Sequence, residues 1–515
     1  MKRISIILLL AVFGITACEK AIDLYPQSNL NTATFYKTTG EINIALVGCY
    51  NGLQKVMTDE WTLTELRSDN VVQGNAASTS TVNRDLSDLD MFFPNTSHAG
   101  LYNYWINSYY NIRNINLVLN SLQVNYNPAT GANTYDKLDL AVLEADRKKM
   151  ASEACFLRAH HYFNLVRLYG GVFLVHEPLA PLDAKLMNRS SVDDIYKLII
   201  ADLQSAATNG VSQKFAQISA ADLGRVNSWG AKALLAKVYL TLNRKADAIA
   251  LLQDVISNSG YSLQANYANI FSITSEMNSE IMFAVRYKAG GLGIGSPFGN
   301  LFAPLNSGSA VVNGDGSGLC YPAMELNNQY LATDLRKPVN IGVYGTGSST
   351  RLYPKKHVNT QIVVRDGETD WPLLRYADVL LMMAEAQGNS SSSISFINLV
   401  RQRAGLTALN AADISSVDLF ENALATERKL EFAFENQRWF DMLRFNTSLT
   451  TIKADQTLKN HFAVMYPLHY ISYPSPRLTL AELQAKVTND KLLLPIPQRE
   501  IDNNTQLVIS QNPGY

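Results

Sequence analysis

The segment from 226 to 260 constrains the fold most, because it encodes two helices with almost no chain between them. Its apolar residues recur at helical spacing in two stripes, namely Trp229, Ala233, Ala236 and Leu240, then Ile249, Leu252 and Ile256. Only residues 243–245 separate the two expected helices, so the helices must be antiparallel neighbours. We therefore predict a mostly α protein built from helical hairpins that resemble tetratricopeptide units, without a regular solenoid.

Helical periodicity recurs on both sides of this hairpin. The expected helices cover residues 41–56, 101–122, 146–169, 192–207, 374–384, 394–403 and 417–445. Between them the glycine-rich stretch 261–371 predicts a loop-rich insertion with one short strand at 281–285. We therefore expect one domain over residues 18–515, with an N-terminal helical part (18–260), this insertion (261–371), and a C-terminal helical part with an extended tail (372–515).

The N-terminus has the pattern of an export signal. Lys2 and Arg3 precede an apolar run over 4–13, and small residues lead directly to Cys18. The run is too short to cross a bilayer. The pattern resembles a bacterial lipobox and predicts a signal peptide over 1–17, with diacylglycerol and palmitate holding Cys18 at a membrane. An ordinary secretory signal with an incidental Cys18 is the alternative.

The net charge and the cysteine and tyrosine content indicate which partners and which disulfides to expect. The formal net charge is -1, which argues against nucleic acid as a partner. Cys49 and Cys155 lie in helical patterns, so we interpret them as buried thiols in preference to a disulfide framework. The 25 tyrosines would suit contact with sugars or peptides, because each ring joins an apolar face to a polar tip.

One pair of carboxylates invites a catalytic interpretation. Glu427 and Glu431 fall on the apolar side of one helix and could act as acid and base in glycoside hydrolysis. Carboxylates on adjacent turns of one helix cannot flank a sugar ring from opposite sides. We therefore predict structural ion pairs, with Arg428, Arg438 and Arg444 as the nearby cations.

Metal and cofactor patterns are incomplete. His160 and His161 diverge on a helix and cannot share a metal, so surface or core roles are expected. The glycines at 291, 293 and 295 do not form a phosphate loop. Residues 313–318 resemble the front of a calcium loop, but its twelfth position is Met324 and no acid stands there. We predict no metal and no cofactor, and calcium has no support.

Several motifs occur in an order that resembles the SusD/RagB family of outer-membrane nutrient-binding lipoproteins. In the N-terminal half they are Glu-Leu-Arg-Ser-Asp-Asn at 65–70, Ala-Cys-Phe-Leu-Arg-Ala at 154–159, Tyr-Gly-Gly at 169–171 and Trp-Gly-Ala at 229–231. In the C-terminal half they are Arg-Tyr-Ala-Asp-Val-Leu-Leu at 375–381, Ala-Glu-Ala at 384–386, Glu-Arg-Lys-Leu-Glu at 427–431 and Arg-Trp-Phe-Asp at 438–441. The segments 398–406, 494–502 and 511–515 complete the set. The resemblance implies an α-α superhelix as scaffold and a loop-built face for the ligand.

The resemblance also implies a function and a partner. It implies a surface lipoprotein of the cell outer membrane that captures a glycan, or in some members a peptide. The protein would deliver this ligand to a SusC-like TonB-dependent transporter and perform no chemistry. A surface glycosidase and a purely structural lid for the transporter are the alternatives.

Candidate ligand contacts follow from the family's use of loop aromatics and a few polar groups. They stand at the start of, or within, the long polar loop expected over residues 70–98, and in the insertion; they are Arg67, Asp69, Asn70, Phe92, Phe93, Tyr287, Phe298 and Tyr321. Core packing is the alternative for each ring. No tryptophan occurs between Trp61 and Trp105, so the stretch lacks the usual platform for stacking a sugar.

Overall fold

A computed structural model describes residues 35–359, 361–504 and 506–515. Cys18 and the predicted signal peptide lie outside the described residues. Within them, none of the helices has the length and apolar content needed to cross a membrane.

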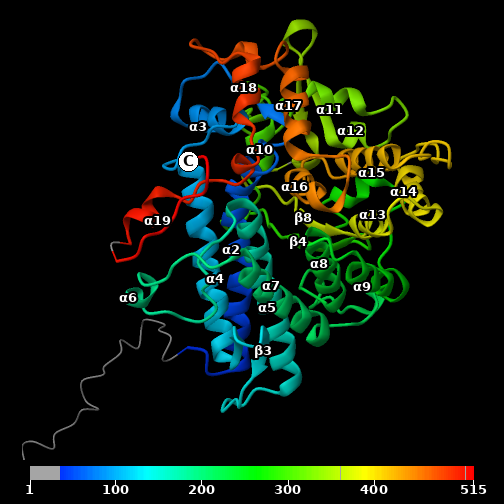
Figure 1. Ribbon diagram of the computed structural model, residues 1–515. Helices are drawn as coiled ribbons and strands as arrows, with labels where there is room; N and C mark the ends of the chain where they lie inside the picture. Colours follow the sequence, from blue (N-terminus) through cyan, green and yellow to red (C-terminus); the bar gives the residue numbers. More distant parts are fainter. Residues whose placement is uncertain (1–34, 360, 505) are drawn as a thin grey trace, which may run out of the picture.

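Paired helices make up most of the N-terminal half (Figure 1). The long helices are α2 (Thr39–Leu63), α4 (Ala99–Ser121), α5 (Glu144–Tyr169) and α7 (Val192–Asn209), with the short α6 (Pro181–Ala184) before α7. Helix α4 packs against both α2 and α5, and α5 packs against α7. The prediction of a mostly helical chain built from helix pairs is confirmed.

The predicted hairpin consists of α8 (Ser228–Thr241) and α9 (Lys245–Asn258). Asn227 caps α8, because its side chain accepts a hydrogen bond from the Gly230 amide. Asn243 turns the chain with φ of +56°, a left-handed conformation that asparagine tolerates well. Helix α9 packs in turn on α13 (Tyr376–Gln387), which pairs with α14 (Ser391–Arg403), so helix pairing continues across the insertion.

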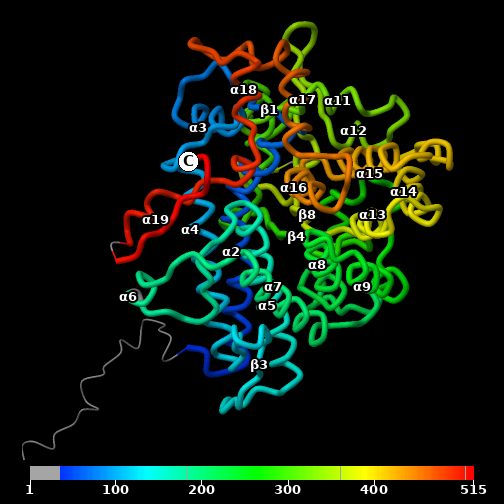
Figure 2. Tube along the Cα trace, in the orientation of Figure 1, coloured from blue at the N-terminus to red at the C-terminus, as the bar shows by residue number. Residues whose placement is uncertain are grey.

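The C-terminal part adds shorter helices and an extended tail. The helices are α15 (Val417–Glu431), α16 (Arg438–Ser448), α17 (Ala454–Met465), α18 (Leu480–Lys486) and α19 (Gln498–Asp502). Between α18 and α19, Leu494 and Ile496 are fully buried, and the Leu494 amide donates to the Leu168 carbonyl at 2.7 Å. The tail therefore runs back along the N-terminal helices, as Figure 2 shows, and the predicted extended segment is confirmed.

The insertion consists of short elements joined by loops. They are β4 (Ile281–Val285), α10 (Phe298–Phe302), β5 (Cys320–Pro322), α11 (Met324–Gln329), α12 (Lys337–Asn340), β6 (Ile341–Tyr344) and β7 (Arg351–Pro354). Strand β4, predicted from its alternation, pairs antiparallel with β8 (Trp371–Arg375). Strands β6 and β7 form a hairpin, as do β2 (Val124–Asn127) and β3 (Ala132–Tyr135).

The stretch 70–98 is more ordered than its composition indicates. It contains β1 (Val71–Gln73), which pairs antiparallel with β5 of the insertion, and α3 (Thr81–Asp90). Ser80 caps α3, and Leu86 and Leu89 bury one face of the helix. The expectation of one long loop is therefore wrong, because a capped ten-residue helix needs only a few buried leucines to hold it against the body.

The three described cysteines are buried and free. Cys49, Cys155 and Cys320 expose at most 2% of their surface and form no disulfide with one another. The interpretation of Cys49 and Cys155 as core thiols is confirmed.

Candidate functional site

The polar residues of the 65–70 motif lie in the interior. Arg67 is 2% exposed, and its guanidinium lies 4.0 Å above the ring of Trp439. Asn70 is fully buried and donates to Glu65. The expectation that these two side chains face a ligand is therefore corrected: Arg67 packs against the C-terminal part of the chain, and Asn70 is bonded within its own motif.

Asp69 also belongs to this internal framework. Arg438 donates to its two carboxylate oxygens from Nε at 2.7 Å and Nη2 at 2.9 Å, and Lys429 lies 2.8 Å away. Burial raises the pKa of Asp69, but the two cations outweigh burial and hold it well below its usual range. Asp69 is 1% exposed, so the expectation of an exposed ligand contact is corrected here as well.

Three of the predicted rings are core residues. Phe92, Tyr287 and Phe298 expose 2%, 4% and 0% of their surface. Phe298 packs edge-to-face on Trp371 with ring centroids 4.6 Å apart. The expectation of exposed stacking faces is wrong for these rings, because an aromatic side chain in a loop fills the core as readily as it faces solvent.

Phe93 and Tyr321 keep part of their surface exposed. Tyr321 lies on β5 opposite Val72 of β1, at the junction of the insertion and the N-terminal half. Phe92 adopts φ of +62°, and this turn after α3 accompanies a buried Phe92 and a partly exposed Phe93. For Phe93 and Tyr321 a role in ligand contact stays a prediction.

Phe93 lines a surface hollow, which we call the Phe93 hollow. It lies between the 76–79 loop, α3 and the segment 473–478, and it holds about 770 Å³ of space, part of it open to solvent. Its apolar lining includes Met91, Phe93, Pro474, Pro476 and Leu478. Its polar lining includes Ser78, Thr79, Arg84, Asp88 and Arg477. An apolar wall with a polar rim suits a ligand that offers both a flat apolar face and hydroxyl groups.

Asp90 holds the floor of the Phe93 hollow in place. Its carboxylate accepts from the Tyr473 hydroxyl at 2.6 Å and from the Gln73 amide at 3.1 Å, and it lies 2.8 Å from His469 Nε2. Tyr473 lines the hollow, although it is some 380 residues from Asp90 in the sequence. These bonds fix the segment 473–478 against α3, so the hollow is preformed.

The second wall of this hollow contains none of the predicted contact residues. The Tyr-Pro-Ser-Pro run at 473–476 is aromatic and proline-rich, which indicates an extended surface segment. Nothing in the local pattern, however, places it beside Phe93, because that contact depends on the tertiary fold.

Glu427 and Glu431 form ion pairs, as predicted, but with other arginines than those named. Glu427 lies 2.6 Å from Arg336 and 3.1 Å from Arg401. Glu431 contacts Arg336 at 3.2 Å, Arg375 at 2.9 Å and Arg403. Both carboxylates are at least 99% buried. The named partners were wrong because they lie on the same or the next helix, whereas the true partners come from other segments.

Arg428 and Arg444, two of the named cations, have other acids. Arg428 pairs with Asp378 and Asp441, and Arg444 pairs with Glu385 and Asp441. The C-terminal part therefore contains a large buried network in which each of these charges has an opposite partner, as buried charges require.

The remaining motifs have structural roles. Burial lowers the pKa of His161 to about 3, and its ring lies 2.8 Å from the Asn111 amide, as expected of a core histidine. Asp315, in the run that resembles a calcium loop, accepts from the amides of Gly308 and Gly316. Within the described ranges, no group of three or more His, Cys, Asp or Glu side chains is arranged to hold a metal ion.

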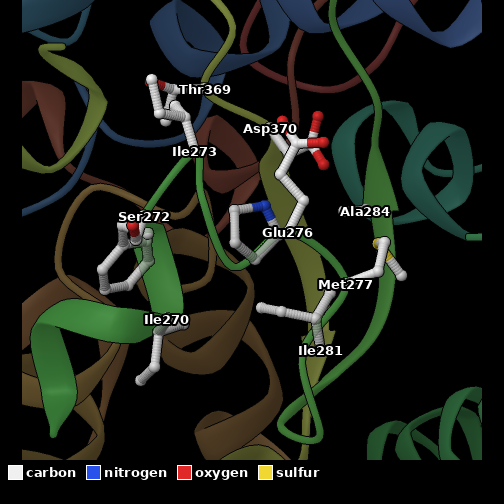
Figure 3. Close-up of a pocket in the computed structure, with 11 residues that line it drawn as sticks. Ile270, Ser272, Ile273, Glu276, Met277, Ile281, Ala284, Thr369 and Asp370 are labelled. Carbon is white, nitrogen blue, oxygen red and sulfur yellow. The ribbon is translucent and has the colours of Figure 1, made fainter.

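A second, smaller pocket lies beside the β4–β8 pair (Figure 3). The carboxylates of Glu276 and Asp370 point into the same part of this pocket, which holds about 300 Å³. Arg286 lies 2.6 Å from Glu276 and 2.5 Å from Asp370. Burial raises the pKa of Asp370 to about 7, with Arg286 opposing the shift. Because one guanidinium pairs with both acids, the pocket is less suited to a ligand than the Phe93 hollow.

Two family models match the chain. The model described as "SusD family" matches residues 279–515, and the model described as "Starch-binding associating with outer membrane" matches residues 22–240.

Named relatives match over nearly their full length. SusD-like protein P25 of Formosa agariphila is 26% identical, and the match covers 99% of this chain and 99% of the relative. A SusD-like protein of Bacteroides ovatus is 23% identical over 98% of this chain and 97% of its own.

Solved structures share the fold. A laminarin-binding SusD-like protein superposes with a TM-score of 0.72 and 25% identity, covering 93% of this chain and 100% of its own. Surface glycan-binding protein A from Bacteroides thetaiotaomicron, in complex with laminarihexaose, has a TM-score of 0.71 and 20% identity over 92% of this chain and 99% of its own. At 20% identity this second likeness concerns the fold alone.

Proposed function

This chain belongs to the SusD family, and on that premise we propose that it binds a glycan at the outer membrane and passes it to a SusC-like TonB-dependent transporter without chemical change. In this proposal a lipid on Cys18 anchors the protein, and the Phe93 hollow is a principal contact for the glycan.

The Phe93 hollow is the observation that carries the proposal. It sets a partly exposed ring and two prolines beside hydroxyl and charged groups, and sugars likewise combine apolar C–H faces with hydroxyl groups. The name of the laminarin-binding relative supports a glucan as the first ligand to test.

The burial of Glu427 and Glu431, the pair considered as acid and base for glycoside hydrolysis, supports binding without chemistry. Glu427 and Glu431 are buried and held by arginines, so neither is placed to touch a sugar on the surface. The membrane location is supported by the description of the N-terminal family model, and the transporter by family membership.

Isothermal titration tests the proposal. The purified protein is titrated with laminarin, with other oligosaccharides and with a peptide pool, and the same samples are assayed for released reducing ends. We expect saturable glycan binding with no release. Phe93→Ala should weaken binding about 10-fold or more, because the buried area of a phenylalanine side chain contributes roughly 1.5–3 kcal/mol.

Tyr110→Ala is the matched control, since Tyr110 is a 62% exposed ring on α4 and does not line the hollow. Unchanged affinity in Phe93→Ala would refute the role of the hollow. Binding of peptides alone would support the peptide alternative, and release of reducing ends would contradict the non-catalytic proposal.

A further inference from the structure

A polar groove, distinct from the Phe93 hollow, is lined by residues of α11, α15 and α17. Figure 1 labels these three helices. It holds about 810 Å³ of space, part of it open to solvent. None of the residues that line it also lines the Phe93 hollow.

Charged side chains form the floor of this groove. Lys429 lies 2.8 Å from Asp69 and 3.2 Å from Glu325, and Arg438 lies 2.7 Å from Asp69. Arg438 is only 6% exposed, and its Nη1 finds no hydrogen-bond partner among the described residues. Because this Nη1 is itself buried, the floor is a rigid polar surface of paired charges, and the hydrogen bonds to a ligand must come mainly from the walls.

Amides and hydroxyls form the walls. They come from three helices and are exposed or partly exposed, namely Gln329, Asn422, Thr426, Gln456, Thr457 and Asn460. Each amide both donates and accepts hydrogen bonds, and each hydroxyl does the same. The walls can therefore match a ligand with several hydroxyl groups.

The charges around the groove indicate a neutral ligand. The lining contains three acids and three bases, namely Asp69, Glu325 and Asp418, then Lys429, Arg438 and Lys453. An anionic ligand would meet carboxylates on the same floor as the cations. An apolar ligand would strip water from charged groups and return no hydrogen bonds, which is costly. A neutral, hydroxyl-rich ligand avoids both penalties.

We propose that this groove is a second saccharide-binding site, which holds neutral sugar units by hydrogen bonds in place of ring stacking. The inference rests on the proposed glycan-binding function, and it adds a site that is independent of the Phe93 hollow.

A buried hydrogen-bond chain joins the floors of the two sites. Glu325 of the groove lies 3.0 Å from His461 Nδ1, and His461 Nε2 lies 3.4 Å from the Tyr470 hydroxyl. Tyr470 donates to Asp90 at 3.3 Å, and Asp90 holds Tyr473 of the Phe93 hollow. Changes in this chain would disturb both sites, so a selective test must change the groove walls.

The test uses the double variant Asn422→Ala/Gln456→Ala, whose side chains are exposed and whose helices accept alanine well. Native mass spectrometry counts bound laminarihexaose, cellohexaose or maltohexaose, and titration gives the affinity of each step. The wild type should bind two molecules of the preferred hexasaccharide, and Phe93→Ala should retain one.

Combining Phe93→Ala with the double variant should weaken the remaining step about 10-fold, the effect of losing two hydrogen bonds of typical strength. Asn51→Ala, an exposed amide on α2, is the matched control and should leave both steps unchanged.

The outcomes separate the two proposals. If Phe93→Ala removes all binding, or if the groove substitutions leave the remaining step unchanged, the second site is refuted while the proposed function stands. If the wild type binds none of the three hexasaccharides, the proposed function fails and the second site fails with it. Tighter binding of an acidic hexagalacturonate in the groove would refute the neutral ligand class.

Discussion

Removing the negative charge of Glu431 should destabilise the protein strongly and leave glycan binding intact. The Glu431 carboxylate is fully buried and pairs with Arg336 at 3.2 Å, Arg375 at 2.9 Å and Arg403. Glu431→Gln keeps the shape of the side chain but leaves these three guanidiniums with one carboxylate fewer.

The magnitude follows from the partners that remain. A charge pair about 4 Å apart contributes roughly 4 kcal/mol at an effective dielectric constant of 20. Arg375 still pairs with Glu280 and Glu435, and Arg336 still pairs with Asp334. These remaining carboxylates offset part of the lost attraction, so the full Coulomb energy of three pairs is not lost. We expect the free energy of unfolding to fall by about 3–5 kcal/mol, the usual cost of breaking one partner of a buried pair.

Urea unfolding measures this change, with Asp247→Asn as the matched control. Asp247 pairs with Arg244 at 2.7 Å, but both side chains are nearly half exposed, so its loss should cost less than about 1 kcal/mol. Equal stability of the two variants would refute the argument that the buried network holds the scaffold. Folded Glu431→Gln that fails to bind glycan would contradict the assignment of Glu431 to the scaffold.

Three further predictions concern other parts of the chain. Gly74→Ala places a Cβ 1.9 Å from the Gly318 carbonyl oxygen and should lower the free energy of unfolding in urea by about 1–3 kcal/mol. Gly48→Ala, with open space around it in α2, should raise the free energy of unfolding by roughly 0.5–1 kcal/mol. Similar effects of the two substitutions would contradict the β1–β5 packing. Because the pKa of Asp370 is raised to about 7, the native state keeps a proton on this side chain between about pH 4 and pH 7, whereas the unfolded state has lost it. Asp370 therefore makes the free energy of unfolding fall as the pH rises through this range. Asp370→Asn should flatten the fall, and an unchanged pH profile of unfolding would refute this reasoning. Cys18→Ala should move the protein from the membrane to the soluble fraction, and persistent membrane attachment would refute the lipid anchor.

Much of the fold could be predicted from the sequence because the spacing of apolar residues in a helix is a local pattern. The stripe of Trp229 and Ala233, the short link at 243–245 and the stripe of Leu252 define the α8–α9 hairpin without knowledge of any other segment. The extended tail at 493–497 follows in the same way from its prolines.

The ligand-facing residues could not be predicted in this way, because exposure is a tertiary property. Phe92 and Phe93 are neighbours of the same type, and only a left-handed backbone at Phe92 separates a core ring from a ring in the hollow. Asp69 is polar and follows a helix, yet it is buried because Lys429 and Arg438 reach it from segments over 350 residues away.

The ion-pair partners illustrate the same limit. Sequence proximity suggested that Arg428 and Arg444 neutralise Glu427 and Glu431, because cations on one helix are the only ones visible to local reasoning. In the structure the arginines that pair with Glu431 come from α12's N-terminal boundary, β8 and α14. The kind of interaction was predictable, whereas the partners were set by the fold.

A crystal structure of the protein with laminarihexaose tests the central claim most directly. The claim is that a rigid scaffold of helix pairs presents a preformed surface that holds a glycan without breaking it. We predict an intact hexasaccharide with a sugar face against the ring of Phe93 and a backbone that matches the unliganded protein. A cleaved ligand, or an intact ligand bound away from the Phe93 hollow with Phe93 uncontacted, would contradict this account.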